Sequence, residues 1–118
     1  MTQEQKELLL KDLCARLPYG VKVQTTYINP QTKERKDIGT DVLSTVEISL
    51  LIDGYYEPKP YLFPLESMTE EQKEEYYGTF SLSGDISGSV DFYNKHHFDY
   101  RGLIPMGLAI DCTNLNIY

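Results

Sequence analysis

The stretch TQEQKELLLKDLCARLPYGVKVQTTYI, from Thr2 to Ile28, changes its hydrophobic period partway along and decides the fold class. Apolar residues recur at helical spacing as far as Leu17. From Val21 onward they alternate with polar residues, as in a strand that has one buried face. We therefore expect a helix that leads directly into a β-strand.

The expected helix runs from Thr2 to Leu17. Thr2 and Gln5 have the spacing of a capping box, and Pro18 and Gly20 end the helix. The predicted buried stripe consists of Leu9, Leu10, Leu13, Cys14 and Leu17. The predicted solvent-exposed face consists of Lys6, Lys11, Asp12 and Arg16.

A second strand is predicted within Leu43–Ile52, because Val46, Ile48, Leu50 and Ile52 alternate with polar residues. The Asn29–Asp41 segment before it is long for a hairpin loop. It is therefore either mobile or part of strands that extend into a twisted ribbon. Asp53–Gly54 after it is the strongest tight-turn signal of the chain.

Further elements follow with weaker signals. Tyr55–Leu65 contains Pro58, Pro60 and Pro64, and a proline-containing strand is expected at a sheet edge. The remaining predictions are a helix over Thr69–Tyr77 that Gly78 ends, a short strand at Thr79–Leu82, a loop at Ser83–Ser89, a helix over Val90–His97 and a last strand at Leu108–Asp111.

These elements predict a single α+β domain over residues 1–118. Its N-terminal helix packs on a small, mainly antiparallel sheet built around Val21–Ile28 and Leu43–Ile52, with two further short helices. The predicted core consists of Leu8–Leu10, Leu13, Leu17, Val21, Val23, Val46, Ile48, Leu50, Phe92, Leu103, Ile104 and Leu108.

The composition is that of a folded protein, with 41% hydrophobic and 25% charged residues among 118. A net charge of −7 repels phosphate backbones, so direct nucleic-acid binding is the first partner class that we reject. The longest apolar runs, such as Leu8–Leu10, are far shorter than the ~20 residues that a membrane span requires. The opening residues lack the pattern of a signal peptide, and we expect a cytoplasmic protein with reduced thiols.

His96 and His97 are the only histidines of the chain, and they are adjacent. Neighbours on a helix diverge by about 100°, so these two cannot bind one metal in the manner of an i, i+4 pair. A metal site would combine one histidine with Asp99 and with Asp91. The competing interpretation is that one histidine caps the helix end while the other is packed or hydrogen-bonded.

The two cysteines are expected to be structural. Cys14 falls on the apolar stripe of the first helix, where a thiol behaves as a small hydrophobic group. Cys112 follows Asp111, whose carboxylate is expected to raise the pKa of the thiol. The sequence indicates no cofactor, and it contains no short motif of a hydrolase or a phosphate loop.

Ten tyrosines and the absence of tryptophan are the unusual feature of the composition. Tyr55, Tyr56 and Tyr61 surround the Asp-Gly turn and are the candidate interaction residues, because tyrosine combines a large apolar face with a polar tip. Tyr55 and Tyr56 occupy successive strand positions and should point to opposite faces. Tyr93 and Tyr100 are expected in the core.

Three segments resemble a group of small proteins from gut Bacteroides and related bacteria. They are ELLLKDLCARLPYGVK at Glu7–Lys22, KPYLFPLESMTEE at Lys59–Glu71 and HHFDYRGLIPMGLA at His96–Ala109, which together make up a little over a third of the chain. The resemblance implies a bacterial, cytoplasmic setting and an association with mobile elements. It carries no activity, cofactor or catalytic residue.

The sequence therefore favours a non-enzymatic protein-binding or accessory module, whose partner is another protein or a second copy of the chain. One alternative is a small metal-dependent or hydrolytic enzyme centred on His96, His97 and Asp99. Another is an acidic mimic of nucleic acid that occupies a DNA-binding protein, although the basic cluster Lys33–Lys36 interrupts the acidic field.

Overall fold

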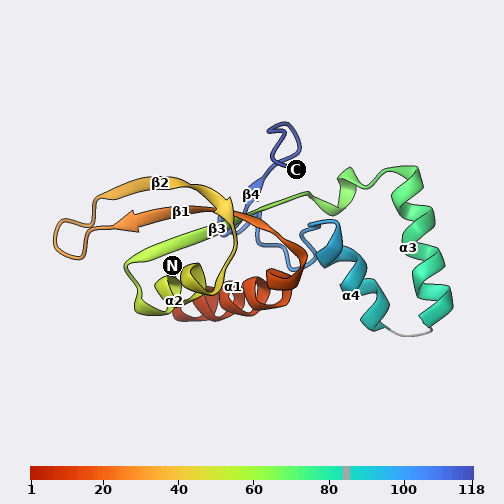
Figure 1. Cartoon of the computed structure of the whole chain (residues 1–118), viewed down its shortest axis with the longest axis horizontal. Helices are drawn as coiled ribbons and strands as arrows, with labels where there is room; N and C mark the ends of the chain where they lie inside the picture. Colours follow the sequence, from red (N-terminus) through yellow and green to blue (C-terminus); the bar gives the residue numbers. More distant parts are fainter. Residues whose placement is uncertain (84–85) are drawn as a thin grey trace.

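The computed structural model describes residues 1–83 and 86–118, and between 79 and 89 it describes the backbone only. The molecule is elongated, with extents of 52 × 27 × 23 Å (Figure 1). The elements follow one another as α1 (Gln3–Arg16), the 3₁₀ turn η1 (Leu17–Tyr19), β1 (Lys22–Ile28), β2 (Arg35–Val42), α2 (Thr45–Asp53), β3 (Tyr56–Leu62), η2 (Leu65–Ser67), α3 (Glu70–Ser83), α4 (Ile86–Lys95) and β4 (Ile110–Asp111).

The four strands form one mixed sheet in the order β2-β1-β3-β4. β1 pairs antiparallel with both β2 and β3, and only the two-residue β4 is parallel to its neighbour β3. α1 and α2 lie together along the sheet, whereas α3 and α4 pack against each other at the end away from the β1–β2 hairpin (Figure 1). The predicted α+β fold, with its N-terminal helix and mainly antiparallel sheet, is confirmed.

The prediction of a strand within Leu43–Ile52 is wrong, because Thr45–Asp53 forms helix α2. The Ser44 side chain accepts a hydrogen bond from the Val46 N–H, and Ser44 forms a capping box with Glu47. At the other end Gly54, with φ 89°, ends the helix, and its N–H donates to the Leu50 carbonyl at 3.2 Å. The Asp-Gly signal is therefore a helix C-cap and not a hairpin turn.

The apolar alternation of this segment also predicted the wrong buried residues. In the helix Leu51 is the residue that is buried, at 1% exposed, whereas Val46 is 61% and Ile52 is 55% exposed. Ile48 and Leu50 are partly buried. The apolar residues of this nine-residue segment fit the period of a helix about as well as that of a strand. The hydrophobic pattern alone therefore does not distinguish the two structures.

β3 was predicted at the sheet edge, but it lies between β1 and β4. Ile28 N–H donates to the Tyr55 carbonyl at 2.8 Å, so alternate residues from Tyr55 onward exchange hydrogen bonds with β1. Pro58 and Pro60 occupy the intervening positions of this alternation. Neither proline therefore deprives the β1–β3 ladder of a donor, and β4 pairs only from Tyr61 onward.

The long connection at Asn29–Asp41 is mostly strand, because β2 occupies Arg35–Val42, as the ribbon alternative anticipated. The loop itself is short and ordered by Asn29, whose side-chain oxygen accepts from the N–H groups of Gln31 and Thr32. Lys33 adopts a left-handed conformation with φ 63°.

The later helices differ from their predicted bounds. α3 continues through the predicted strand at Thr79–Leu82 and ends at Ser83. Of the predicted loop at Ser83–Ser89, residues 84–85 lie outside the described part of the chain, and α4 already begins at Ile86. α4 ends at Lys95, two residues before the predicted end. The last strand is confirmed at Ile110–Asp111.

The core lies where α1, α2 and the sheet meet the segment after α4. Most predicted residues take part in it, with the addition of Leu43, Leu51, Leu62 and Ala109. Cys14, predicted in the buried stripe of α1, is exposed. Among the described residues, no helix is long and apolar enough to cross a membrane.

Leu13 tests the core, because it is fully buried between α1 and the sheet. The substitution Leu13→Ala should lower the free energy of unfolding by about 2–5 kcal/mol through lost burial and the cavity that remains. Urea denaturation gives this value, and Val46→Ala is the matched control, because Val46 is 61% exposed. Equal midpoints for the two variants would contradict the assignment of Leu13 to a rigid core.

Candidate functional site

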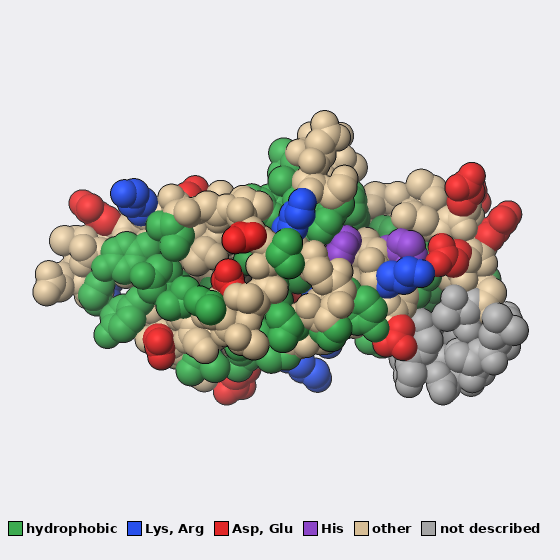
Figure 2. Space-filling model, viewed as in Figure 1, with side chains coloured by type: hydrophobic (Ala, Val, Ile, Leu, Met, Phe, Trp, Pro, Cys, Tyr) green, Lys and Arg blue, Asp and Glu red, His purple; other side chains and the backbone are tan. Residues whose placement is uncertain are grey.

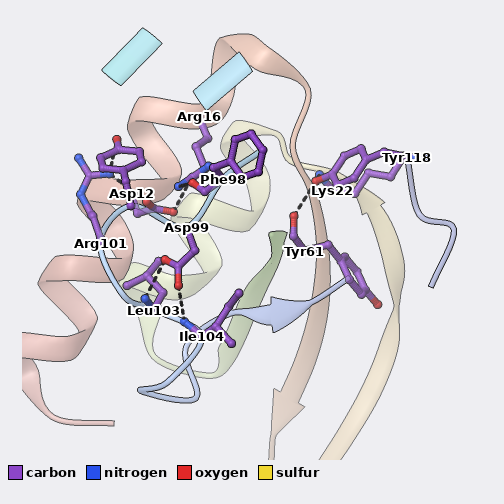
Figure 3. A network of polar contacts seen from close by, with 11 residues as sticks. Asp12, Arg16, Lys22, Tyr61, Phe98, Asp99, Arg101, Leu103, Ile104 and Tyr118 are labelled. Carbon is purple, nitrogen blue, oxygen red and sulfur yellow. Dashed lines mark hydrogen bonds and ion pairs between the residues drawn. The ribbon is translucent and has the colours of Figure 1, made fainter. Parts of the chain in front are cut away.

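A buried ion network joins α1 to the segment that follows α4 (Figure 3). Arg16 and Asp12 are both 0% exposed, and the Arg16 Nε donates to Asp12 Oδ2 at 2.8 Å. The second oxygen of Asp12 accepts from Arg101 Nη1 at 2.9 Å. Arg16 Nη2 donates to the Phe98 carbonyl at 2.6 Å. One carboxylate therefore compensates two guanidinium groups.

The prediction that Asp12 and Arg16 face solvent is wrong. Both residues are buried because distant parts of the chain compensate their charges. Asp12 binds Arg101, and Arg16 contacts the Phe98 carbonyl and the ring of Tyr100. Arg101 lies 4.5 Å and Arg16 lies 5.2 Å from its centroid. The Tyr100 hydroxyl also accepts from Arg101 at 2.6 Å. A charged side chain on an apolar helix is buried only where such compensation exists.

His97 terminates α4 in a left-handed conformation, with φ 61°. Its N–H donates to the Asn94 carbonyl at 3.3 Å, and the Phe98 N–H donates to the Tyr93 carbonyl at 2.8 Å. These two bonds form a Schellman motif, in which His97 occupies the position usually taken by glycine or asparagine. The helix end is thus capped by backbone groups, not by a histidine side chain.

The His97 ring stacks on Tyr118 with the ring centroids 3.9 Å apart. Burial, the Arg16 charge and the neighbouring His96 together lower the pKa of His97 to about 4. The ring is therefore neutral at physiological pH, and its Nδ1 is buried without a hydrogen-bond partner among the described residues. A neutral imidazole suits the position beside a buried guanidinium.

His96 and Asp99 each have partners other than His97. His96 Nε2 lies 3.3 Å from Glu75 Oε1 of α3, and its ring packs against Phe92. The carboxylate of Asp99 is buried and accepts from the N–H groups of Leu103 and Ile104 at 2.8 and 2.9 Å, which fixes the turn after α4 (Figure 3). Asp91 accepts from the Tyr19 hydroxyl at 3.3 Å.

The described residues contain no group of three or more His, Cys, Asp or Glu side chains placed to hold a metal ion. Cys112 is buried, and burial and the Asp111 charge raise the pKa of its thiol to about 11. The thiol is therefore protonated and a poor nucleophile at neutral pH. The expected effect of Asp111 is present, although burial is the larger cause.

Tyr118 completes the sheet in a way that the sequence analysis missed. Its hydroxyl accepts from the Lys22 N–H at 2.8 Å and donates to the Tyr61 carbonyl at 2.9 Å (Figure 3). The β1–β3 register stops at Val23 and Pro60, so Lys22 and Tyr61 are the next pair of the ladder. The hydroxyl takes the place of a direct backbone hydrogen bond, and burial raises the pKa of Tyr118 to about 12.

The tyrosines divide into two groups. Tyr93 stacks between Tyr76 and Tyr100 with centroid distances of 5.3 and 5.4 Å, which extends the ion network to α3. Tyr55 is 49% exposed, at the turn between α2 and β3. Tyr56 is half-buried, and its ring lies 5.3 Å from that of Tyr27 on β1.

Tyr61 differs from the other two candidate interaction residues, because it is only 6% exposed. Its hydroxyl lies 2.9 Å from the Thr40 Oγ1 atom, across the sheet. The structure therefore leaves Tyr55 exposed and Tyr56 half-buried at the start of β3, and it places Tyr61 within the sheet. Tyr61 lies between Pro60 and the buried Leu62, and this local sequence does not indicate whether its side chain is exposed or buried.

A hollow of about 270 Å³ lies beside Tyr55, lined by Met1, Gln3, Lys6, Leu51, Gly54, Tyr56 and Glu57. The Lys6 Nζ donates to the Ile52 carbonyl at 3.0 Å, which fastens α1 to the end of α2. We refer to Ile52, Tyr55, Tyr56 and this hollow as the Tyr55 surface. In Figure 2, hydrophobic side chains gather at this end of the molecule, where α2 leads into β3.

The chain matches no protein-family model, no curated protein and no solved structure.

The ion network predicts strong coupling between Asp12 and Arg16. Asp12→Leu should lower the free energy of unfolding by about 3–5 kcal/mol, because it leaves buried guanidinium groups without a carboxylate. The double variant Asp12→Leu/Arg16→Met should cost less than the sum of the two single variants, as measured by urea denaturation. The exposed pair Glu70 and Lys73 serves as a control, and its removal should have little effect. Additive losses at Asp12 and Arg16 would contradict the network.

The lowered pKa of His97 predicts a pH dependence of stability. Between pH 6.5 and about 4 the unfolded chain binds a proton at this residue that the native chain does not. The contribution is therefore fully present above the unfolded pKa and is lost as the pH falls, to a total of roughly 3 kcal/mol. In His97→Asn, which retains tolerance for positive φ, the free energy of unfolding should fall less steeply between pH 7 and pH 4. An unchanged slope would show that another group is responsible.

Proposed function

We propose that this chain is a non-enzymatic protein-binding or accessory module of the bacterial cytoplasm and that its binding region is the Tyr55 surface. The observation that carries the proposal is the exposure of Ile52 and Tyr55, at 55% and 49%, whose chain neighbours Leu51, Gly54 and Tyr56 line a hollow. An exposed aromatic ring near a hollow with both polar and apolar walls is an arrangement that a protein partner can use as an anchor site.

The surface is rigid before any partner binds. Gly54 fixes the end of α2, Lys6 ties that end to α1, and Tyr56 is held by Tyr27 and by its strand pairing. Rigid aromatic side chains lose little conformational entropy on binding, so more of the interaction energy appears as affinity.

The hollow indicates the kind of group that a partner would insert. Leu51, Tyr56 and Met1 supply apolar walls, and Lys6 and Glu57 place one charge of each sign at the same opening. An apolar side chain flanked by polar backbone groups suits this lining better than an isolated ion. A protein segment therefore fits the site better than a phosphate or a metal.

The charge distribution is less favourable for the alternative of a nucleic-acid mimic. Such a protein presents a continuous acidic field, whereas basic side chains are interspersed with the acidic ones on the face seen in Figure 2. The cluster Lys33–Lys36 lies at the tip of the β1–β2 hairpin and in the adjoining strand. We therefore place the protein-binding function first.

Affinity capture from the bacterial host tests the proposal. Wild type and Tyr55→Ala are compared, with Tyr77→Ala as the matched control, because Tyr77 is also exposed, at 64%, but lies on α3. We expect a captured protein to be lost with Tyr55→Ala and retained with Tyr77→Ala. Hydrogen exchange of the complex should slow at residues 52–57. Equal capture by all three proteins would refute the Tyr55 surface as the binding region.

A further inference from the structure

β2 is an open edge of the sheet. Within the described part of the chain it pairs with β1 on one side only, and all eight of its residues, Arg35–Val42, are exposed. Ile38 and Val42 are large apolar residues on this edge, at 54% and 46% exposed. An unpaired strand of this length presents a row of free N–H and C=O groups that another strand can bind.

The ladder with β1 determines which backbone groups of β2 are free. Leu43 N–H donates to the Val21 carbonyl at 2.8 Å, and Asn29 N–H donates to the Glu34 carbonyl at 2.9 Å. Hydrogen-bonded pairs alternate along an antiparallel ladder, and an irregularity between Thr25 and Thr26 shifts the alternation by one residue. The backbone groups that face away from β1 are therefore those of Arg35, Asp37, Thr40 and Val42.

This shift makes β2 complementary to itself. When two β2 strands run antiparallel about a two-fold axis between Ile38 and Gly39, Arg35 lies opposite Val42 of the second copy and Asp37 lies opposite Thr40. Each of these pairs joins two residues whose backbone groups face away from β1, and symmetry repeats both pairs. The irregularity opposite Thr25 and Thr26 adds one residue to β2. Without this extra residue, the outward-facing backbone groups of the two strands would not meet in this register.

The charges agree with the same register. Lys36 lies opposite Asp41 of the second copy, and the symmetry produces this pair twice. In the single chain the outward-facing Val42 N–H donates to the Asp41 carboxylate at 2.8 Å. In the pair the Arg35 carbonyl of the second copy takes that N–H, so the carboxylate is released to Lys36. A register shifted by one residue sets Asp37 against Asp41 in one direction and Arg35 opposite Asp41 in the other. In neither direction do the outward-facing backbone groups of the two strands meet, so the backbone match and the charges together select the proposed register.

The apolar contacts agree as well. A hollow of about 240 Å³ beside β2 is lined by Gly39, Ile38 and Leu50 together with Thr25, Thr40, Asp41 and Glu47. In the proposed register Ile38 of the second copy lies directly opposite Gly39. Residues opposite each other in a sheet share a face, so this side chain enters the hollow above a residue that has no side chain.

We propose that two copies of this chain associate through their β2 edges in this register and form one continuous sheet. The inference rests on the proposed function in its general form, a protein-binding module, and names a second copy as one partner. It uses a different surface from the Tyr55 surface, so the two can fail separately.

Charge reversal tests the register. Sedimentation velocity over a concentration series gives the dimer dissociation constant at low salt. Lys36→Glu and Asp41→Lys should each weaken the dimer roughly tenfold, because each creates two like-charge pairs. The double variant Lys36→Glu/Asp41→Lys restores opposite charges and should return to within about threefold of wild type.

Cross-linking supplies a second, independent measurement. In a Cys14→Ser background, which removes the exposed native thiol, Lys36→Cys and Asp41→Cys are prepared as separate proteins. Residues in a non-hydrogen-bonded pair have Cα atoms about 4.5 Å apart, within the range of a disulfide. Oxidation should produce a covalent dimer from the mixture of the two proteins and much less from either alone.

Three results would overturn the inference. The first is a wild-type protein that remains monomeric into the millimolar range. The second is a dimer that charge reversal does not weaken or that the double variant does not recover. The third is a dimer that Tyr55→Ala abolishes while the β2 variants leave it intact, which would assign self-association to the Tyr55 surface instead. In contrast, loss of Tyr55-dependent capture with an intact β2 dimer would refute only the proposed function.

Discussion

The carboxylate of Asp12 is the group on which the closure of this domain depends. It is fully buried on α1 and holds Arg16 and Arg101, which are 85 positions apart in the chain, at opposite oxygens. Arg16 can reach the Phe98 carbonyl only because the left-handed His97 turns the chain directly before it. The Schellman motif, the ion network and the stack of Tyr76, Tyr93 and Tyr100 therefore form one continuous arrangement that fixes α3 and α4 to α1.

Local sequence patterns predicted those parts of the fold that depend on local interactions. The change of period after Leu17 correctly predicted the helix and the strand, because one buried face determines each of them. α2 was missed because its apolar residues satisfy both periods, and the capping box at Ser44 and the Gly54 cap carried the decisive information. Asp12 and Arg16 have the i, i+4 spacing of a helical ion pair, but their burial had no local signal, since their further partners Arg101 and Phe98 lie 89 and 82 residues away.

The candidate surfaces show the same division. Tyr55 precedes β3 and is exposed, whereas Tyr56 begins the strand and is half-buried, so the different burial of the two follows from local structure. The edge of the sheet could not be predicted, because β2 reads RKDIGTDV and has no alternating apolar residues. Such a polar segment becomes a strand only through its neighbour β1. The same polarity keeps it unpaired on its outer side until a complementary strand is available.

The Tyr118 hydroxyl stands between Lys22 and Tyr61 where a backbone pair would otherwise close the β1–β3 ladder. Lys22 and Tyr118 are separated by 96 residues, whereas the other β1–β3 pairs join segments much closer in the chain. During synthesis the β1–β2 hairpin and the β1–β3 pairing can therefore form first, and this last position of the ladder is filled only when residue 118 has emerged. The position of the Tyr118 hydroxyl therefore determines which contact of the sheet forms last.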